Sequence, residues 1–423
     1  MAVVNTQELV TSEAPATPHQ QSLRFASALN YGVTFATEFL VMISQIILYK
    51  IVASWLGQTG FSEYAVARRV VAFLQPVTMV GFGVALPRYL ALAEGRGDSQ
   101  RCSRYLFATV LAAGGFTLTL AAALMIGRHW FSYLLFGAKE RQYLIPAVAL
   151  MLVGMSLHAI LYAFFRGRMA MGRANALQVM NNCLAPLVVF ALFHKDPADY
   201  LVHLGLAWTV ATAVILLLTA MQHGWQRPRN EARELLGYGL QRVPGDFAFM
   251  ALLGLPAIFA AHLTDIREAG MVAFGLAIVN MVASAFAPIG IILLPKVSRA
   301  LGSGDFNSVR HEVVLIRRIA LVIPAAIVLI IELFGSRLIR IYLGPAYTDT
   351  GFIVNLLVLG AVPLAFYSAL RSVIDAFHHR AINTLNVLVA LVLFLLGSAI
   401  GGWLPNFQIL LWSFAGAMVV LAL

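Results

Sequence analysis

Long apolar segments recur along the whole chain, and they favour a membrane-embedded architecture over any other. Each holds roughly 20 residues, the length that an α-helix needs to cross a hydrocarbon core of about 30 Å. Hydrophobic residues make up 60% of the 423 residues and charged residues only 11%, whereas soluble domains carry about 25% charged residues. The strands of an outer-membrane barrel would instead alternate over about ten residues. We therefore predict an all-α polytopic membrane protein.

The apolar segments predict twelve transmembrane helices, six in each half of the chain. We expect residues 1–26 to form a disordered cytoplasmic tail, 27–222 a first lobe, 223–234 a cytoplasmic linker and 235–423 a second lobe. The twelve predicted spans lie near residues 29–51, 64–87, 105–126, 142–165, 176–193, 201–221, 238–262, 270–294, 313–334, 351–370, 382–402 and 408–423.

A repeated motif relates the two halves. LPRYLA with the following GRGD recurs about 208 positions later as LPKVSR with GSGD, so that Pro87 matches Pro295 and Arg88 matches Lys296. Six spans is an even number, so the two lobes share one orientation. This arrangement predicts a pseudo-twofold axis along the membrane normal, with a binding site between the lobes near the bilayer midplane.

The distribution of basic residues predicts how the chain is oriented. With the N-terminus inside, 18 Lys and Arg fall in cytoplasmic stretches and seven in outer loops, as the positive-inside rule requires. Both termini are then cytoplasmic. Trp55, Trp130 and Trp403 lie at the ends that we call outer, and Trp225 lies at an inner end. The same rule accounts for the net charge of +10, so we predict no nucleic-acid partner.

Apart from Arg317 and Arg318 at the inner end of the ninth span, which are counted with the cytoplasmic stretches, seven charged residues fall inside predicted spans. Such groups are costly at bilayer depth and are candidates for function. They are Lys50, Arg68, Arg69, Arg242, Glu38, Asp246 and Glu332.

Arg68 and Arg69 are adjacent, and the second lobe has Leu276 and Ala277 in their place. Successive residues of a helix are about 100° apart, so the two side chains cannot point the same way. One reading has at least one of them facing a cavity, where the planar guanidinium suits a phosphate or diphosphate. In the other reading they snorkel to the outer headgroups.

Arg242 and Asp246 stand four residues apart at the inner end of the seventh span. In one reading they form a neutralising pair within one helix. In the other, Arg242 contacts an anion and Asp246 is its partner or a protonatable switch. Pro244 and Gly245 between them predict a broken helix beside a cleft.

The remaining ionisable positions carry weaker signals. Glu38 lies deep in the first span and aligns with Asp246 across the repeat, so the two acids are predicted to face each other across the cleft. Glu38 either carries a proton or forms a structural hydrogen bond. Lys50 is a fourth candidate for substrate binding, with snorkelling as the alternative. Glu332 is expected to be interfacial.

The chain shows no pattern typical of an enzyme or a metalloprotein. Cys102 and Cys183 have no metal-ligand spacing, and no phosphate-binding loop, zinc motif or nucleophile elbow is present. The outer loops are too short for the catalytic groups of a glycan polymerase or ligase. We predict no enzymatic activity and no cofactor, while a scaffolding role in glycan assembly stays open.

The two six-span halves with LPRYLA, YGLQRVPGDF and LPKVSRALGSGDF resemble the polysaccharide-flippase branch of the multidrug/oligosaccharidyl-lipid/polysaccharide (MOP) exporter superfamily. The resemblance covers residues 25–423. It implies a bacterial inner membrane and alternating access. The implied cargo is a polyprenyl-diphosphate-linked oligosaccharide, flipped outward for surface polysaccharides such as lipopolysaccharide. It also implies contact with membrane lipids and other glycan-assembly proteins, and H+ or Na+ as coupling ion. Drug or organic cation antiport is the alternative. By the same resemblance, four basic side chains bind the diphosphate, namely Arg68, Arg69, Arg242 and Lys50. Two acids, Glu38 and Asp246, couple or gate transport.

Overall fold

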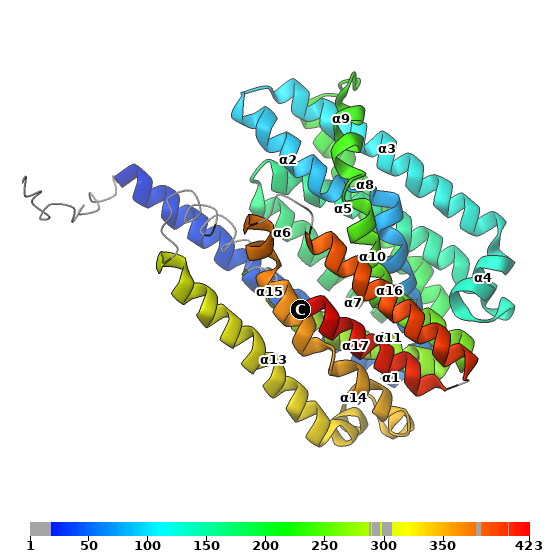
Figure 1. Ribbon diagram of the computed structural model, residues 1–423. Coiled ribbons are helices and arrows are strands. Elements are labelled where there is room, and N and C mark those ends of the chain that lie inside the picture. The colour runs from blue at the N-terminus through cyan, green and yellow to red at the C-terminus, as the bar shows by residue number, and fades with distance from the viewer. Residues whose placement is uncertain (1–17, 287–288, 290–296, 298–306, 378–381, 405) are drawn as a thin grey trace, which may run out of the picture.

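Every regular element of the described chain is a helix (Figure 1). The second copies of the repeat motifs, around Pro295 and His379, lie outside the described residues, as do the first 17 residues of the predicted tail. The computed structural model describes residues 18–286, 289, 297, 307–377, 382–404 and 406–423.

The helices follow the predicted order of spans. Those of the first half are α1 (Pro18–Met79), α2 (Phe82–Gly95), α3 (Ser99–Ile126), α4 (Arg128–Phe136), η1 (Lys139–Leu144), α5 (Ile145–Gly167), α6 (Met171–Val179), η2 (Met180–Leu184), α7 (Ala185–Leu192) and α8 (Pro197–His223). Those of the second half are α9 (Glu231–Gly239), α10 (Val243–Leu263), α11 (Ile266–Ser284), α13 (Asn307–Tyr342), η3 (Pro345–Tyr347), α14 (Gly351–Val358), α15 (Ala361–Phe377), α16 (Ile382–Trp403) and α17 (Phe407–Ala422).

The helices account for all twelve predicted spans. Ten helical segments of the described chain are long and apolar enough to cross a membrane. One of them, Gly32–Met79, holds two spans because Gly57 interrupts it, and α17 is a shorter apolar helix. The predicted fold class, an all-α membrane protein with twelve helices in two lobes, is confirmed.

Gly57 divides α1 into a first arm (residues 32–56) and a second arm (residues 58–79). Its φ of 66° and ψ of −175° suit glycine, because a Cβ would be strained there. The arms fold back on each other, since the rings of Tyr49 and Tyr64 lie 5.6 Å apart on opposite sides of the turn. The first two spans therefore form a helical hairpin with almost no connecting loop.

The first lobe is built around α5, which packs against α3 and α8. Close backbone approach makes this possible, because a Cβ on Gly154 of α5 would meet Trp208 of α8 at 2.7 Å. Exposed apolar side chains on the far side of α8, such as Val210 and Leu217, face outward. In a membrane these side chains contact acyl chains, so burial inside this lobe relies on packing between helices.

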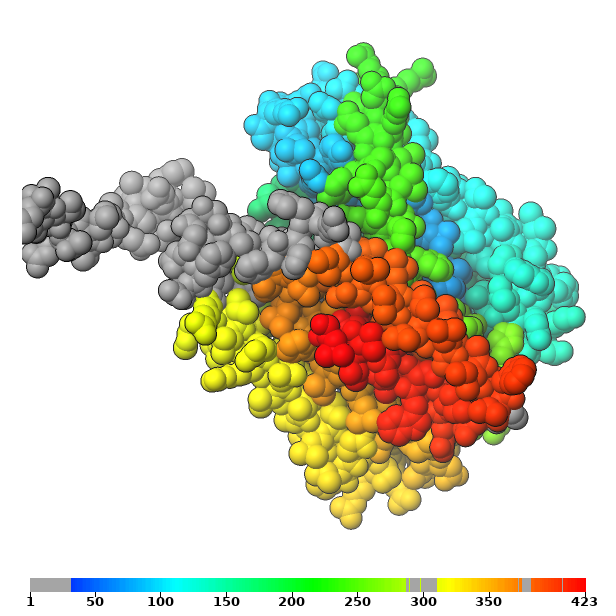
Figure 2. Space-filling view, in the orientation of Figure 1, coloured from blue at the N-terminus to red at the C-terminus, as the bar shows by residue number. Residues whose placement is uncertain are grey.

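The two lobes meet mainly where the second arm of α1 packs against α10 and α11. Glycines bring the backbones together along this seam: a Cβ on Gly254 would meet Phe73 at 2.7 Å, and one on Gly270 would meet Ser62 at 2.2 Å. At the inner end α2 contacts α9. In Figure 2, α9 and α10 (green) reach over α2 (blue), while α13 to α17 (yellow to red) form the opposite side.

Candidate functional site

Arg68 lies inside the first lobe and begins a network of polar side chains. Its Nη2 donates a hydrogen bond to Gln45 Oε1 at 3.1 Å. Its guanidinium carbon lies 5.9 Å from the ring centroid of Tyr64 and 5.7 Å from that of Trp208. Nη1 is buried and has no hydrogen-bond partner. Arg68 therefore holds a cation within the lobe against aromatic rings, with no carboxylate paired to it among the described residues.

The network continues from Gln45 into the fifth span. Gln45 Nε2 donates to the backbone oxygen of Asn182 at 2.8 Å, and Asn182 Nδ2 donates to Gln178 Oε1 at 3.1 Å. Gln178 Nε2 in turn donates to Glu38 Oε1 at 3.4 Å. Polar groups thus connect Glu38 to Arg68 through the interior of one lobe.

A π-helical turn, η2, makes this connection possible. Pro186 has no N–H, so it cannot bond the carbonyl four residues earlier, on Asn182. The N–H of Ala185 bonds the oxygen of Met180 instead of that of Asn181. Two buried carbonyls are thereby released. Gln45 and Ser44 donate to Asn182, and Trp208 Nε1 donates to the oxygen of Asn181 at 2.6 Å. π-Turns of this kind are frequent at functional sites.

His158 joins the network beside this turn. Its Nε2 lies 3.1 Å from Gln178 Oε1, and its Nδ1 lies 3.0 Å from Asn181 Nδ2. Since the amide nitrogen of Asn181 only donates, Nδ1 is the acceptor and Nε2 carries the proton. The Asn181 amide also donates to Thr212 Oγ1 at 2.9 Å. A second titratable side chain therefore lies one hydrogen bond from the Gln178 that contacts Glu38.

Arg69 points to the other lobe, in keeping with the geometry of neighbouring helical residues. Its Nε donates to the backbone oxygen of Ala273 on α11 at 3.2 Å. One guanidinium thus lies within the first lobe and its neighbour lies on the seam between the lobes. Neither forms an ion pair among the described residues.

Lys50 connects the lobes at their outer ends. Its Nζ donates to the backbone oxygen of Ile341 at 3.0 Å and lies 6.0 Å from the ring of Tyr342. Nearby, Gln58 Nε2 donates to the oxygen of Ala346 at 3.3 Å, and the Tyr342 hydroxyl donates to the oxygen of Ile46. The lysine therefore contacts the second lobe in this structure.

Aromatic rings fill the space beneath these outer contacts. Neighbouring ring centroids lie 5.3 to 6.0 Å apart, mostly edge to face, an arrangement worth about 0.5–1.5 kcal/mol per pair beyond burial. Both lobes contribute, so the rings hold the outer ends of the lobes together. We call them the outer aromatic cluster: Tyr49, Phe61, Tyr64, Phe274, Tyr342 and Tyr347.

Arg242 lies at the inner end of the seam, beside Tyr238. Its Nη2 donates to the Tyr238 hydroxyl at 3.2 Å, and Arg88 of α2 lies 4.3 Å from the same ring. Both arginines are exposed. The helix interruption falls at residues 240–242, so Pro244 occupies the first turn of α10, where a missing N–H costs little. Two guanidinium groups, one from each lobe, therefore share one phenol.

Arg88 and Arg242 together lower the pKa of Tyr238. Burial raises the pKa of the Tyr238 hydroxyl, but hydrogen bonding by Arg88 and the charges of Arg242 and Arg88 outweigh it, so its pKa lies below the ordinary value. Arg88→Ala is expected to raise this pKa toward about 10. Fluorine NMR of 3-fluorotyrosine protein, assigned with Tyr238→Phe, measures the titration. Arg96→Ala, at an exposed position of the loop between α2 and α3, should leave the pKa of Tyr238 unchanged.

The two predicted acids occupy different surroundings. Glu38 contacts Gln178 of its own lobe, and Asp246 is exposed near the inner end of α10. No hydrogen bond or ion pair of the described residues joins Glu38 to Asp246, or Arg242 to Asp246. Glu332 lies on α13 with no ion pair to any described residue.

Sequence reasoning missed three parts of this site. Glu63 lies between the first two predicted spans, yet it is 4% exposed and its Oε1 accepts a 2.5 Å hydrogen bond from Tyr143. The pairing of Arg88 with Tyr238 required knowing that α2 meets α9. The π-turn did leave a signal, namely two asparagines followed by Pro186 within an apolar span.

Comparison with known proteins agrees with this architecture. A multidrug resistance MATE transporter of the MOP superfamily, solved in an inward-facing conformation, aligns with a TM-score of 0.74 and 14% identity over 93% of this chain and 95% of its own. The lipid II flippase MurJ, in an inward closed conformation, gives 0.69 and 14% over 93% and 86%. A Vibrio cholerae MATE transporter gives 0.64 and 16% over 95% and 96%.

Sequence comparison identifies the family. No curated protein sequence matches significantly. The profile of a family described as polysaccharide biosynthesis protein matches residues 27–301, which is more than half of the chain. The chain therefore belongs to the polysaccharide biosynthesis protein family and has the fold of MOP-superfamily transporters and flippases.

Proposed function

We propose that the protein flips a polyprenyl-diphosphate-linked oligosaccharide from the cytoplasmic to the periplasmic leaflet of a bacterial inner membrane by alternating access. One observation carries the proposal. The lobes are joined at their outer ends by Lys50 and the outer aromatic cluster, while guanidinium groups with no ion pair to any described residue lie along the seam and at its inner end. A carrier that accepts an anionic head group from the cytoplasm needs a closed outer end and cations on the inner side.

The basic residues define a path for the diphosphate. Arg88 and Arg242 are exposed at the inner end and come from different lobes, so they meet the head group first. Arg69 and then Arg68 lie farther along the second arm of α1 toward the outer end. A guanidinium binds two phosphate oxygens at once, which suits this cargo better than a point charge.

The acids take a coupling or gating role in this proposal. Glu38 is linked to Arg68 through Gln178, Asn182 and Gln45. A proton or Na+ that binds at Glu38 changes the charge at one end of this connection and the hydrogen bonding along it. Asp246 and Lys50 supply charges at the inner and outer ends of the seam, where the lobes separate.

The charge of the seam separates this proposal from multidrug or organic cation antiport, the alternative function for this fold. A cation requires unpaired carboxylates in the cleft, whereas the charged side chains midway along the second arm are two arginines, one directed into each lobe. Arg68 and Arg69 have no paired acid among the described residues.

Removing these charges tests the function. Arg69→Ala, Arg242→Ala and Arg68→Ala are each expected to lower flipping of a fluorescent polyprenyl-diphosphate oligosaccharide about 10- to 100-fold in proteoliposomes, because each loses charge-assisted hydrogen bonds worth about 1.5–3 kcal/mol. In cells, the lipid-linked precursor should accumulate on the cytoplasmic side while protein levels stay normal.

Arg96→Ala is the matched control, since Arg96 is an exposed arginine of the α2–α3 loop. Wild-type flipping by all three variants would contradict a diphosphate grip. Uptake of organic cations in exchange for protons, with no glycan flipping, would favour the antiporter instead.

A further inference from the structure

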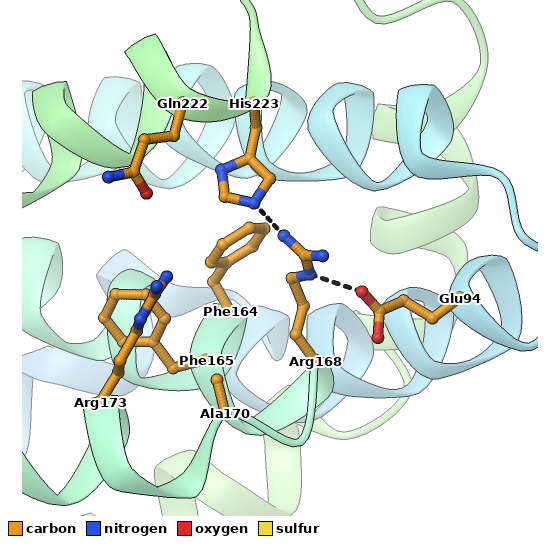
Figure 3. Close-up of a pocket in the computed structure, with 8 residues that line it drawn as sticks. All are labelled: Glu94, Phe164, Phe165, Arg168, Ala170, Arg173, Gln222 and His223. Carbon is orange, nitrogen blue, oxygen red and sulfur yellow. Dashed lines mark hydrogen bonds and ion pairs between the residues drawn. The ribbon is translucent and has the colours of Figure 1, made fainter.

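A cavity opens at the inner end of the first lobe, on the side away from the seam. It has a volume of about 410 Å³ and lies between the end of α5, the start of α6 and the end of α8 (Figure 3). Glu94, Arg168, Arg173, Gln222 and His223 contribute its polar groups. Cavities of this size suit small ligands or part of a larger one.

The first arginine of the cavity donates hydrogen bonds to two protein side chains. Arg168 Nε donates to Glu94 Oε1 at 2.5 Å, and Nη1 donates to His223 Nε2 (Figure 3). His223 Nδ1 lies 2.9 Å from the backbone oxygen of Thr219, so Nδ1 carries the proton and the imidazole is neutral. Arg168 and Glu94 thus cancel in charge, and the cavity keeps one uncompensated cation.

That cation is Arg173. Its side chain points along the cavity toward Gln222 in Figure 3, and it has no hydrogen bond or ion pair with any described residue. The Gln222 amide likewise has no partner among the described residues. An exposed guanidinium and an amide, both without partners in the described part of the chain, together offer several donors to an anion.

An apolar groove begins where the cavity ends. A second cavity of about 370 Å³ shares Phe165, Arg173 and Gln222 with the first, and its other walls are almost wholly apolar. These walls are Ala176, Leu177, Met180, Ile215, Leu218 and, as the one polar residue, Thr219. From Arg173 to Met180 the helix rises roughly 10 Å, so the groove runs from the inner surface toward the middle of the bilayer.

This groove faces lipid. Leu218 is 52% exposed and Met221 beside it is 68% exposed, and such side chains contact acyl chains in a membrane. The first arm of α1 contacts the opposite side of the fifth span, where Asn175 donates to Thr34. Trp225, 52% exposed at the end of α8, marks headgroup depth, as interfacial tryptophans do.

From these features we propose that the groove binds an anionic phospholipid of the inner leaflet. Its phosphate accepts hydrogen bonds from Arg173 and Gln222, and an acyl chain lies along the groove between α6 and α8. Basic pockets between helices at the inner surface suit such headgroups. The single uncompensated charge favours a lipid of net negative charge over a zwitterionic one, and a free phosphate would leave the apolar groove unused.

Lipid retention by the intact protein tests this site. Full-length protein in detergent micelles is given equal amounts of phosphatidylglycerol and phosphatidylethanolamine, and bound lipid is counted by native mass spectrometry. Wild type is expected to retain phosphatidylglycerol with about tenfold preference, reflecting a charge-assisted contact. Arg173→Ala should remove the preference, and Ala176→Trp, which fills the groove, should lower retention of both lipids.

Arg166→Ala is the matched control. Arg166 is an exposed arginine at the end of α5, where it stacks on Tyr162 and does not line the cavity. It should retain the preference. Three results would overturn the site: equal retention of both lipids by wild type, wild-type retention by Arg173→Ala, or displacement of phosphatidylglycerol by inorganic phosphate. Displacement by undecaprenyl diphosphate at equal concentration would assign the groove to the transported lipid instead.

Discussion

Gly270→Leu is expected to abolish flipping and to open the outer ends of the lobes. A Cβ at Gly270 would lie 2.2 Å from Ser62 Oγ and 2.4 Å from Ser62 Cα, so the second arm of α1 and α11 cannot approach as they do in the wild type. Overpacking costs about 1–3 kcal/mol even where side chains can adjust, and here backbone atoms lie in the way. We expect at least about 100-fold slower flipping, since 2.8 kcal/mol corresponds to about 100-fold.

Labelling distinguishes an opened outer end from a misfolded protein. Phe61 is fully buried in the outer aromatic cluster, so Phe61→Cys in a Cys102→Ala, Cys183→Ala background should resist a membrane-impermeant maleimide added outside. Adding Gly270→Leu should make it react. Gly83→Leu is the control, because a Cβ at Gly83 meets nothing within 4 Å. A reactive Phe61→Cys with normal flipping in the Gly270→Leu protein would show that these outer contacts do not gate transport, and an unreactive one would show that Gly270→Leu does not open them.

Arg104→Ala is expected to destabilise the first lobe by about 3–5 kcal/mol, the cost of leaving a buried charge unpaired. Arg104 Nε lies 2.9 Å from Glu231 Oε1, and Glu231 is only 5% exposed. Glu231 is the first residue of α9 and also accepts a hydrogen bond from the N–H of Arg229. The pair therefore fixes α3 to the helix that begins the second half of the chain. Thermal unfolding of the purified protein, followed by fluorescence, should show a midpoint lower by several degrees.

A double variant isolates the charge as the cause. Arg104→Ala with Glu231→Gln removes both charges, so it should recover most of the lost stability. Arg96→Ala, on an exposed residue nearby, should change the midpoint little. If the single and double variants unfold at the same temperature, packing of the Arg104 side chain, and not its charge, holds this contact.

The sequence predicted the number and order of spans because hydrocarbon thickness sets a length that apolar runs must meet. It also predicted that Arg68 and Arg69 diverge, since that follows from helix geometry. It could not predict which lobe each of the two arginines would contact. That depends on how the second arm of α1 rests between α8 and α11, and the glycines at 254 and 270 set this distance through contacts far away in the chain.

Other parts of the site depend on where backbone hydrogen bonds are lost. Pro186 predicts a freed carbonyl, but the partners that satisfy Asn181 and Asn182 come from the first arm of α1 and from α8. Likewise, Glu63 stands next to an outer turn in the sequence, and only the return of residues 141–143 from the following loop buries it. Long-range pairing of this kind leaves no periodic signal in one sequence.

The near absence of a loop at Gly57 has a consequence for biogenesis. Because the two arms of α1 meet at a single glycine, the connecting segment that must cross the membrane during insertion is a few uncharged residues around Gln58 and Thr59. The first two spans can therefore enter the bilayer from the ribosome as one preformed hairpin, with no polar segment to translocate. Lengthening this turn with charged residues should slow integration of the nascent chain even where the finished protein tolerates them.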